Sequence, residues 1–271
     1  SNTTDRNDCL WDIGGHDQHT NHFGGNGLHI YDDFSMSSRP KVGESNVIEK
    51  NKVHIYQIEN NGSQFKTFVD GLTQMTGPSG GVYFDEDSSI GMMRNANVYS
   101  GFFEGEIAEL ILFDKVLSDS ERISINYYLT KKWGISNVDS DGDGIVDEYD
   151  TDPTDPTKWM VIPSVLRQNS SDSYTPSSNL ELWYDASNTD GENNLSIGSN
   201  ASIGVWRDLS GKANHVTQST DSKKPILTTN SNKQYLSFDG SNDSLVGDFL
   251  GHILDNPTGQ NVTVFTVVKP K

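Results

Sequence analysis

The sequence predicts an all-β fold, a sandwich of two antiparallel sheets with one short helix and an acidic linker. Short stretches of β-forming residues recur along the 271 residues, and Gly, Asn, Asp and Ser separate them. Only 33% of the residues are hydrophobic, yet 10% are aromatic, a composition typical of short strands joined by polar turns. A helical period occurs in one place, residues 118–134.

Strand patterns fill the first part of the chain. After a first strand at residues 9–13, they cover residues 27–33, 52–60, 64–71, 80–86 and 105–115. The single cysteine, Cys9, lies in the first strand and cannot form an intrachain disulfide. We therefore interpret it as a small buried hydrophobic residue.

The helical segment carries signals at both of its ends. Ser118 and Glu121 have the spacing of a capping box, and Gly134 suits the left-handed position that ends a helix. The apolar face is formed by Ile125, Leu129 and Trp133, which recur every fourth residue. The segment therefore predicts one short helix with its apolar face buried.

A change in composition divides the chain into three parts. Residues 1–135 hold the first strands and the helix, residues 136–179 are acidic and then rich in Ser, Pro and Asn, and strand patterns resume in residues 180–271. The later strands are expected at residues 180–187, 201–211, 234–243 and 261–271. The middle part is therefore predicted to be a linker.

The last strand is expected to lie in the centre of a sheet. Its β-branched and aromatic residues occupy both faces: Val262, Val264 and Thr266 on one, and Thr263, Phe265 and Val267 on the other. A strand with apolar or β-branched residues on both faces is typically buried on both sides. A strand of this kind needs a neighbour along each edge.

Both outer parts resemble bacterial laminin-G-like domains of the concanavalin A-like type. Residues 101–135 are similar to the closing segment of that family, with GEIAE in a strand and a short helix ending in KKWG. Residues 180–271 are similar to the opening half, with WYDAS, WRDLSG and FDGSND. The resemblance implies a concanavalin A-like jelly-roll sandwich.

The two halves occur in the reverse of the family's order. Residues 180–271 followed by 1–135 make a continuous domain of 227 residues. We expect the opening half to be completed by residues equivalent to 1–135 of the next copy or chain, in a head-to-tail assembly. The assembly seam is then formed by Val262, Val264, Phe265, Val267, Lys271 and Ser1. The alternative is that one chain folds back on itself as a circular permutant.

The acidic part of the linker has the spacing of a calcium-binding loop. Its proposed ligands are Asp139, Asp141, Asp143, Asp147 and Asp150 at loop positions 1, 3, 5, 9 and 12, with the Ile145 carbonyl at position 7. Gly144 takes the sharp turn, while Pro153 and Pro156 exclude the exit helix of an EF-hand.

This run also resembles thrombospondin type 3 calcium repeats, which implies a Ca²⁺-stiffened spacer. Asp150, together with Asp152 and Asp155, is expected to help hold a second ion. The alternative interpretation of the run is a solvated acidic spacer. A stiff spacer would favour separate sandwiches over a chain that folds back on itself.

The charge balance limits the partners. The net charge is −18, from 38 acidic and 20 basic residues, so the basic surface needed for nucleic acid is not expected. No apolar run reaches the length of a membrane-spanning helix. Copies of the chain itself, and glycans, remain as expected partners.

Catalysis is not expected. Glu104, Glu106 and Glu109 approach the E-x-D-x-x-E pattern of glycosidases built on a similar sandwich, but the middle acid is Glu. In an unbroken strand Glu109 would also point to the opposite face from the other two. The segment fits a structural closing strand equally well.

Two further groups of residues have plainer interpretations. His16, His19 and His22 have a spacing that could bind zinc, but flanking glycines indicate an exposed polar loop. Trp183 and Trp206 could line a sugar site, but we expect them in the core or in turns.

The sequence therefore predicts a non-catalytic structural or adhesive repeat of a secreted or surface-attached bacterial adhesin or filament. A carbohydrate-binding module of a larger secreted protein is the alternative, and an exposed aromatic platform would distinguish it. A glycosidase would need a pair of carboxylates in a cleft.

Overall fold

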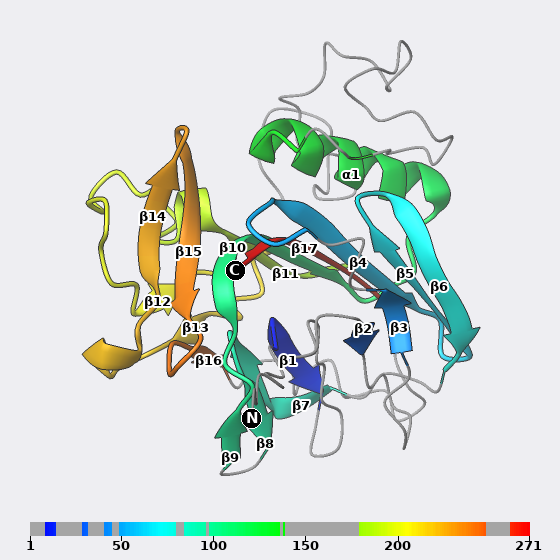
Figure 1. Ribbon diagram of the computed structural model, residues 1–271, viewed down its shortest axis with the longest axis horizontal. Helices are drawn as coiled ribbons and strands as arrows, with labels where there is room; N and C mark the ends of the chain where they lie inside the picture. The colour runs from blue at the N-terminus through cyan, green and yellow to red at the C-terminus, as the bar shows by residue number, and fades with distance from the viewer. Residues whose placement is uncertain are drawn as a thin grey trace, which may run out of the picture.

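A computed structural model of the chain describes residues 9–14, 29–31, 41–44, 49–79, 84–95, 98–135, 138, 179–247 and 261–271. Two antiparallel sheets pack against each other, and one helix covers the other face of the larger sheet (Figure 1). The buried side chains of both sheets and the helix form one hydrophobic core. The predicted all-β architecture of two antiparallel sheets with one helix is confirmed, whereas the jelly-roll topology stays a prediction.

The larger sheet has eight strands, seven of them on its main path. Their order is β14 (Ile226–Asn230), β15 (Lys233–Asp239), β10 (Glu104–Phe113), β17 (Val262–Pro270), β4 (His54–Asn60), β5 (Gln64–Val69) and β6 (Leu72–Pro78), with β11 (Leu180–Asp185) paired to β10 off this path. Strand β10 pairs with β15 along its first half and with β11 along its second half.

The smaller sheet is built from shorter strands. Its order is β1 (Trp11–Gly14), β7 (Phe84–Ile90), β16 (Leu245–Gly247), β13 (Val216–Thr217) and β12 (Val205–Trp206). Two small hairpins, β2 (His29–Tyr31) with β3 (Lys41–Glu44) and β8 (Met93–Asn95) with β9 (Val98–Ser100), lie apart from both sheets in the pairing scheme. Short 3₁₀ turns follow β11 at Ala186–Asn188 and precede β14 at Asp221–Lys223.

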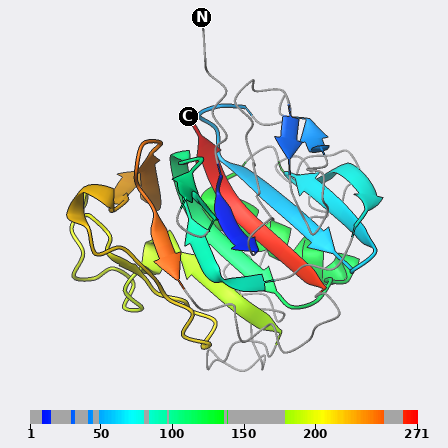
Figure 2. The same cartoon turned by 90° about the horizontal axis from the view of Figure 1, so that it is seen from below.

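Strand β17 lies between β10 and β4 of its own chain (Figure 2). The seam residues Val262, Val264, Phe265 and Val267 are all buried within it, and Lys271 follows at its exposed end. The ring of Phe265 meets that of Phe113 edge to face, with centroids 6.5 Å apart. On the other face, the indole of Trp11 in β1 donates to the Thr266 hydroxyl over 2.9 Å, so β17 contacts both layers.

The two halves thus complete one sandwich within a single chain. Residues 180–271 pack directly against residues 1–135 of the same chain, because β17 pairs with β10 and β4. Both ends of the linker also return to the same body, because Val138 is fully buried and the Asp114 amide donates to the Asn179 carbonyl over 3.1 Å. Completion by a second copy would use the same strand pairs, and it stays a prediction.

The helix α1 (Asp119–Trp133) forms as the sequence predicts. Ser118 and Glu121 form the capping box, and Gly134 adopts a left-handed conformation with φ of 66°. Leu129 and Ile125 are fully buried against the larger sheet. Both end signals and the apolar face are therefore confirmed.

Polar side chains of α1 are also buried. Asn126 is fully buried, and neither atom of its amide has a hydrogen-bond partner among the described residues. The guanidinium of Arg122 stacks 4.9 Å from the centre of the Phe68 ring, while its Nε and Nη1 are likewise unsatisfied. The helix therefore packs on the sheet with a costly polar layer.

Replacing Asn126 with leucine is expected to stabilise the fold by about 1 kcal/mol. The change removes two unsatisfied buried polar atoms and adds apolar contact at a similar side-chain length. Urea unfolding followed by circular dichroism measures the effect. A loss of stability would mean that a water molecule or a residue outside the described part hydrogen-bonds this amide.

Candidate functional site

The three glutamates of β10 lie on one face of the sheet, contrary to the expectation for Glu109. Glu106 and Glu109 are three residues apart, yet they pair with Lys269 and Val267 of β17, which are only two apart. An extra residue, Ala108, bulges out between Ile107 and Glu109 and reverses the alternation. The sequence expectation was wrong because the strand is not unbroken.

On this face Glu109 lies beneath α1, which contacts it through Tyr128, Lys132 and Trp133. Glu109 is 1% exposed, and both of its carboxylate oxygens accept hydrogen bonds. The indoles of Trp183 and Trp133 donate over 2.7 and 2.6 Å, and the Tyr128 hydroxyl donates over 3.2 Å. Lys132 Nζ adds an ion pair at 2.9 Å. This carboxylate is therefore committed to internal contacts.

Lys132 neutralises two carboxylates at once. Its Nζ lies 2.6 Å from Asp185 Oδ2 as well as 2.9 Å from Glu109 Oε2, and it also donates to the Tyr128 hydroxyl. Burial alone would lower the pKa of Lys132, but Asp185 and Glu109 outweigh burial and hold that pKa well above its usual value. Burial raises the pKa of Glu109, while Lys132 opposes the rise.

These side chains join the two halves of the sandwich, and we call them the seam cluster. The first half supplies Glu109, Tyr128, Lys132 and Trp133, and the second half supplies Trp183 and Asp185. Each member comes from a segment that carries the family resemblance. The sequence placed Lys132 at the helix end and Trp183 in the core, but it gave no signal that they meet around Glu109.

The WRDLSG segment forms a turn and not the long strand expected at residues 201–211. The carboxylate of Asp208 accepts from the backbone amides of Trp183, Ser210 and Asn214 over 2.9, 2.9 and 3.0 Å. Trp206 is fully buried, and its indole donates to the Asp185 carbonyl over 3.1 Å. Because Trp183 is also buried, the expectation that both tryptophans are core residues is confirmed.

The FDGSND segment forms a second self-contained turn. Asp239 Oδ1 accepts from the backbone amides of Ser241 and Asn242 over 2.8 and 3.0 Å. Asp243 Oδ2 accepts from the Asp239 amide over 3.1 Å. Burial, with a contribution from the Asp239 charge, raises the pKa of Asp243 to about 6. These carboxylates stabilise the turn between β15 and β16.

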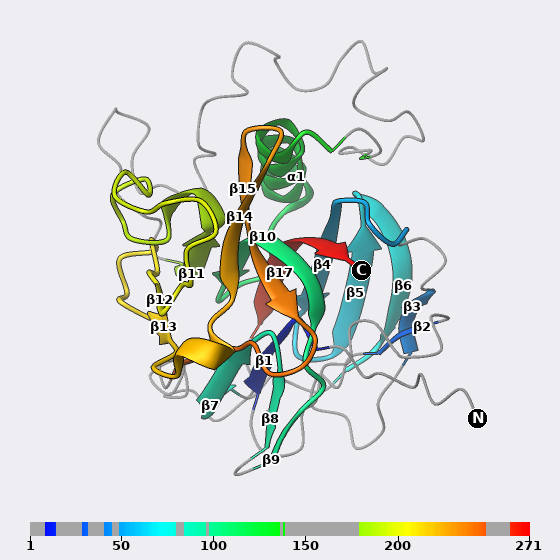
Figure 3. The same ribbon diagram turned by 60° about the vertical axis from the view of Figure 1, so that its left-hand side comes forward.

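One cavity lies where the two halves meet, and another lies within the second half. The first lies between the end of α1 and the β14–β15 hairpin, which stand next to each other in Figure 3, and has a volume of about 420 Å³. Its lining is Lys132, Trp133, Ser187, Thr229, Asn232, Lys233 and Gln234. The other, also of about 420 Å³, lies beside the loop that follows β11.

Several predicted site residues lie outside the described residues. They are the calcium-ligand candidates Asp139, Asp141, Asp143, Ile145, Asp147, Asp150, Asp152 and Asp155, the histidines His16, His19 and His22, and the seam residue Ser1. Within the described ranges, no group of three or more His, Cys, Asp or Glu is placed to hold a metal ion. The same ranges contain no helix long and apolar enough to cross a membrane.

Comparisons with protein-family models, curated proteins and solved structures found no match. The resemblance to laminin-G-like domains therefore remains a prediction. So do the calcium site and the role at the cell surface.

Proposed function

We propose that this chain is a non-catalytic structural or adhesive module of an extracellular bacterial surface protein, assembled from exchangeable half-sandwiches. The supporting observation is the position of β17, a central strand supplied by one half and paired on both edges by the other. The proposal treats the linker as a calcium-binding spacer. In this proposal, the ion pairs and hydrogen bonds of the seam cluster stabilise the contact between the halves.

The contacts between the halves do not depend on which chain supplies each half. Exchange of identical elements between protomers keeps every strand pair and changes only the path of the linker. Because β17 is buried on both faces and paired on both edges, an unpaired copy would expose a template for another chain. Head-to-tail exchange that does not close would give a filament.

The linker determines whether the second half of a chain packs on the first half of the same chain or on that of another copy. Forty residues, 139–178, separate Val138 from Asn179. A flexible linker of this length spans roughly 35 Å on average and gives an effective concentration in the millimolar range, which favours closure within one chain. A calcium-stiffened linker would return to its own sandwich less easily and would favour exchange.

Complementation between two damaged chains tests the exchange. Phe265→Asp places a charge in the core of the second half, and Phe113→Asp does the same in the first half. Each variant alone is expected to be insoluble. When the two are expressed together, the intact first half of one can pair with the intact second half of the other, and a soluble heterodimer is expected in light scattering.

A matched pair provides the control. Phe113→Asp expressed with Ile111→Asp damages the same half twice, so no intact sandwich can form, and no soluble complex is expected. If the first pair is as insoluble as this control, half exchange does not occur. The chain is then a circular permutant that closes only on itself.

Calcium is expected to bind the acidic linker and to shift this balance. Calorimetric titration after chelation should show a saturable site that is lost in Asp141→Ala. Light scattering at a fixed protein concentration should show larger assemblies with calcium than with chelator. If the original chain and Asp141→Ala give the same isotherm, the calcium assignment is wrong. If the assemblies have the same mass with calcium and with chelator, calcium does not control assembly.

The second candidate function is a carbohydrate-binding module folded as a circular permutant. Closure within one chain favours it, as does the cavity lined by hydroxyl and amide groups of Ser187, Thr229, Asn232 and Gln234. However, Trp133 beside this cavity is only 3% exposed, so it offers no stacking platform. Retention on immobilised polysaccharides, lost in Gln234→Ala, would favour this function over assembly.

A further inference from the structure

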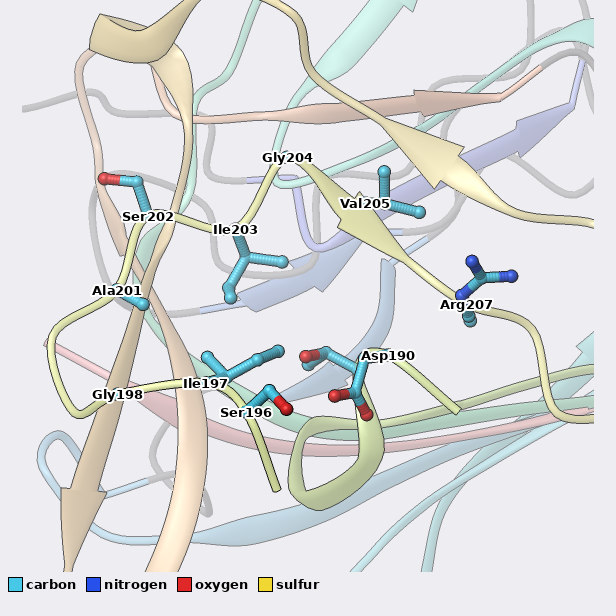
Figure 4. A pocket seen from close by; sticks show the side chains of 11 residues that line it. Asp190, Ser196, Ile197, Gly198, Ala201, Ser202, Ile203, Gly204, Val205 and Arg207 are labelled. Atoms are coloured by element: carbon cyan, nitrogen blue, oxygen red, sulfur yellow. The ribbon is translucent and has the colours of Figure 1, made fainter. Parts of the chain in front are cut away.

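The cavity beside the loop that follows β11 is built only from the second half of the chain. It is lined by Thr189, Asp190, Ser196, Ile197, Gly198, Ala201, Ser202, Ile203, Gly204, Val205 and Arg207. Figure 4 shows the side chains around the hollow, with Asp190 and Arg207 toward one end and Ile197 and Ile203 beside them. A volume of about 420 Å³ is within the range of sites for small molecules.

Two opposite charges flank this cavity without pairing. Asp190 Oδ1 accepts from the amides of Glu192 and Asn194 over 2.8 and 2.9 Å, while Oδ2 has no hydrogen-bond partner among the described residues. The guanidinium of Arg207 makes no ion pair or side-chain hydrogen bond within the same ranges, although it lies at the same cavity. The site therefore offers one free carboxylate oxygen and one free planar donor group.

The loop that carries Asp190 is held in one conformation. Asn194 accepts from the backbone and hydroxyl of Thr189 over 2.7 and 2.8 Å and donates to the Ala186 carbonyl and to Gln234 Oε1. Asn193 and Asn194 both have positive φ, near 59° and 55°, a conformation that these interactions maintain. Asp190 is thus fixed before any ligand arrives, which reduces the entropic cost of binding.

Part of the remaining cavity wall is aliphatic, although Ser196 and Ser202 also line it. Ile197, Ile203 and Ala201 lie at its wall, and Val205 is an exposed aliphatic residue, with 46% of its surface in solvent. A Cβ atom added at Gly198 would meet no atom within 4 Å, so the space beside this glycine is open. An aliphatic group placed here would contact branched side chains next to two unpaired charges.

We propose that this cavity binds a small aliphatic α-amino acid as its zwitterion. The ligand carboxylate would accept two hydrogen bonds from N–H groups of the Arg207 guanidinium, and the ligand ammonium would donate to Asp190 Oδ2. The aliphatic side chain of the ligand would lie against Ile197 and Ile203. A ligand with only one charge would leave the opposite group of the site unpaired. This inference does not depend on the assembly proposed above.

Leucine and two of its derivatives test the inference. Leucine amide lacks the carboxylate, and N-acetyl-leucine lacks the ammonium. Saturation-transfer NMR and calorimetry with the full chain are expected to show millimolar or tighter binding of leucine. Each derivative is expected to bind about tenfold or more weakly, which corresponds to loss of one charged contact.

Three variants locate the binding. Arg207→Gln is expected to weaken leucine but to leave leucine amide unchanged, and Asp190→Asn is expected to weaken leucine but to leave N-acetyl-leucine unchanged. Gly198→Leu fills the open space and is expected to abolish binding of all three. Asp190→Asn retains the oxygen that accepts from the loop amides, and Gly198 has no positive φ, so the variants keep the fold.

Unchanged thermal unfolding of the three variants verifies that the loop is intact. The inference is overturned if leucine does not bind saturably at millimolar concentration. It is also overturned if Gly198→Leu binds leucine as the original chain does, or if both derivatives bind as well as leucine.

Discussion

Glu109→Ala is expected to destabilise the sandwich by about 3–5 kcal/mol, enough to leave much of the protein unfolded. The change removes the acceptor of two indole N–H groups, from Trp133 and Trp183, that are buried with it. It also leaves Lys132 paired only with Asp185, on the other half. Because removing one partner of a buried cluster leaves the others desolvated and unpaired, the cost exceeds that of a lost surface ion pair.

Glu106→Ala is the matched control. Glu106 lies on the same strand and the same face, and it forms one ion pair with Lys269 at 3.2 Å. It is only partly buried, and the indoles of Trp133 and Trp183 donate to Glu109 instead, so its removal should cost about 1 kcal/mol or less. Urea unfolding of both variants gives the comparison. Equal losses would show that the seam cluster does not hold the halves together.

The sequence predicted the helix and the terminal strand because the signals for both are local. The capping box and the left-handed Gly134 act over a few residues, and the burial of β17 follows from apolar residues on both of its faces. The bulge at Ala108 has no such signal. A strict period of two therefore placed Glu109 on the wrong face, and it concealed the seam cluster.

Edge strands and turns were the weaker part of the sequence prediction. Strand β6 is largely exposed, so it lacks the alternation that indicates a strand, and the sequence analysis did not predict it. Residues 201–211 contain β-branched and aromatic residues, yet Asp208 attracts the nearby backbone amides and forms a turn. Only a two-residue strand, β12, remains in that segment.

The choice between closure and exchange could not be made from sequence. Both arrangements pair β17 with β10 and β4 in the same register, so the same residues are buried in either case. The difference lies in the linker and in the concentration of other copies. The sequence favoured completion by another copy because a stiff linker was expected. In the structure of one chain, the linker instead allows the second half to pack on the first half of the same chain.

The stability of the fold is expected to fall as pH rises from 4.5 to 7, and Glu59 is the main expected cause. Glu59 is 6% exposed on the helix-covered face of β4. Burial raises its pKa from 4.5 to about 7, although the positive charges of Arg122 and Lys66 oppose the rise. Between these pH values the folded chain keeps the proton that the unfolded chain has lost, so proton binding favours the folded state.

That contribution is fully present below pH 4.5 and is lost once the pH passes about 7, where the buried carboxylate must ionise in the folded state. A shift of this size corresponds to about 3 kcal/mol. Glu59→Gln removes the titration, and its amide oxygen can still accept from Gln57, which donates to Glu59 over 2.9 Å. The variant should therefore be more stable than the original chain at pH 8 by up to about 3 kcal/mol.

Well below pH 4.5, at about pH 3, the two proteins should differ little, because Glu59 is then protonated in both the folded and the unfolded original chain. Urea unfolding of both at a series of pH values gives the difference in the free energy of unfolding directly, and contributions common to both proteins, such as that of Asp243, cancel. A difference that stays constant across this range would show that Glu59 is not the titrating group. A difference that grows toward low pH would mean that Arg122 holds the carboxylate ionised, with a pKa below its usual value.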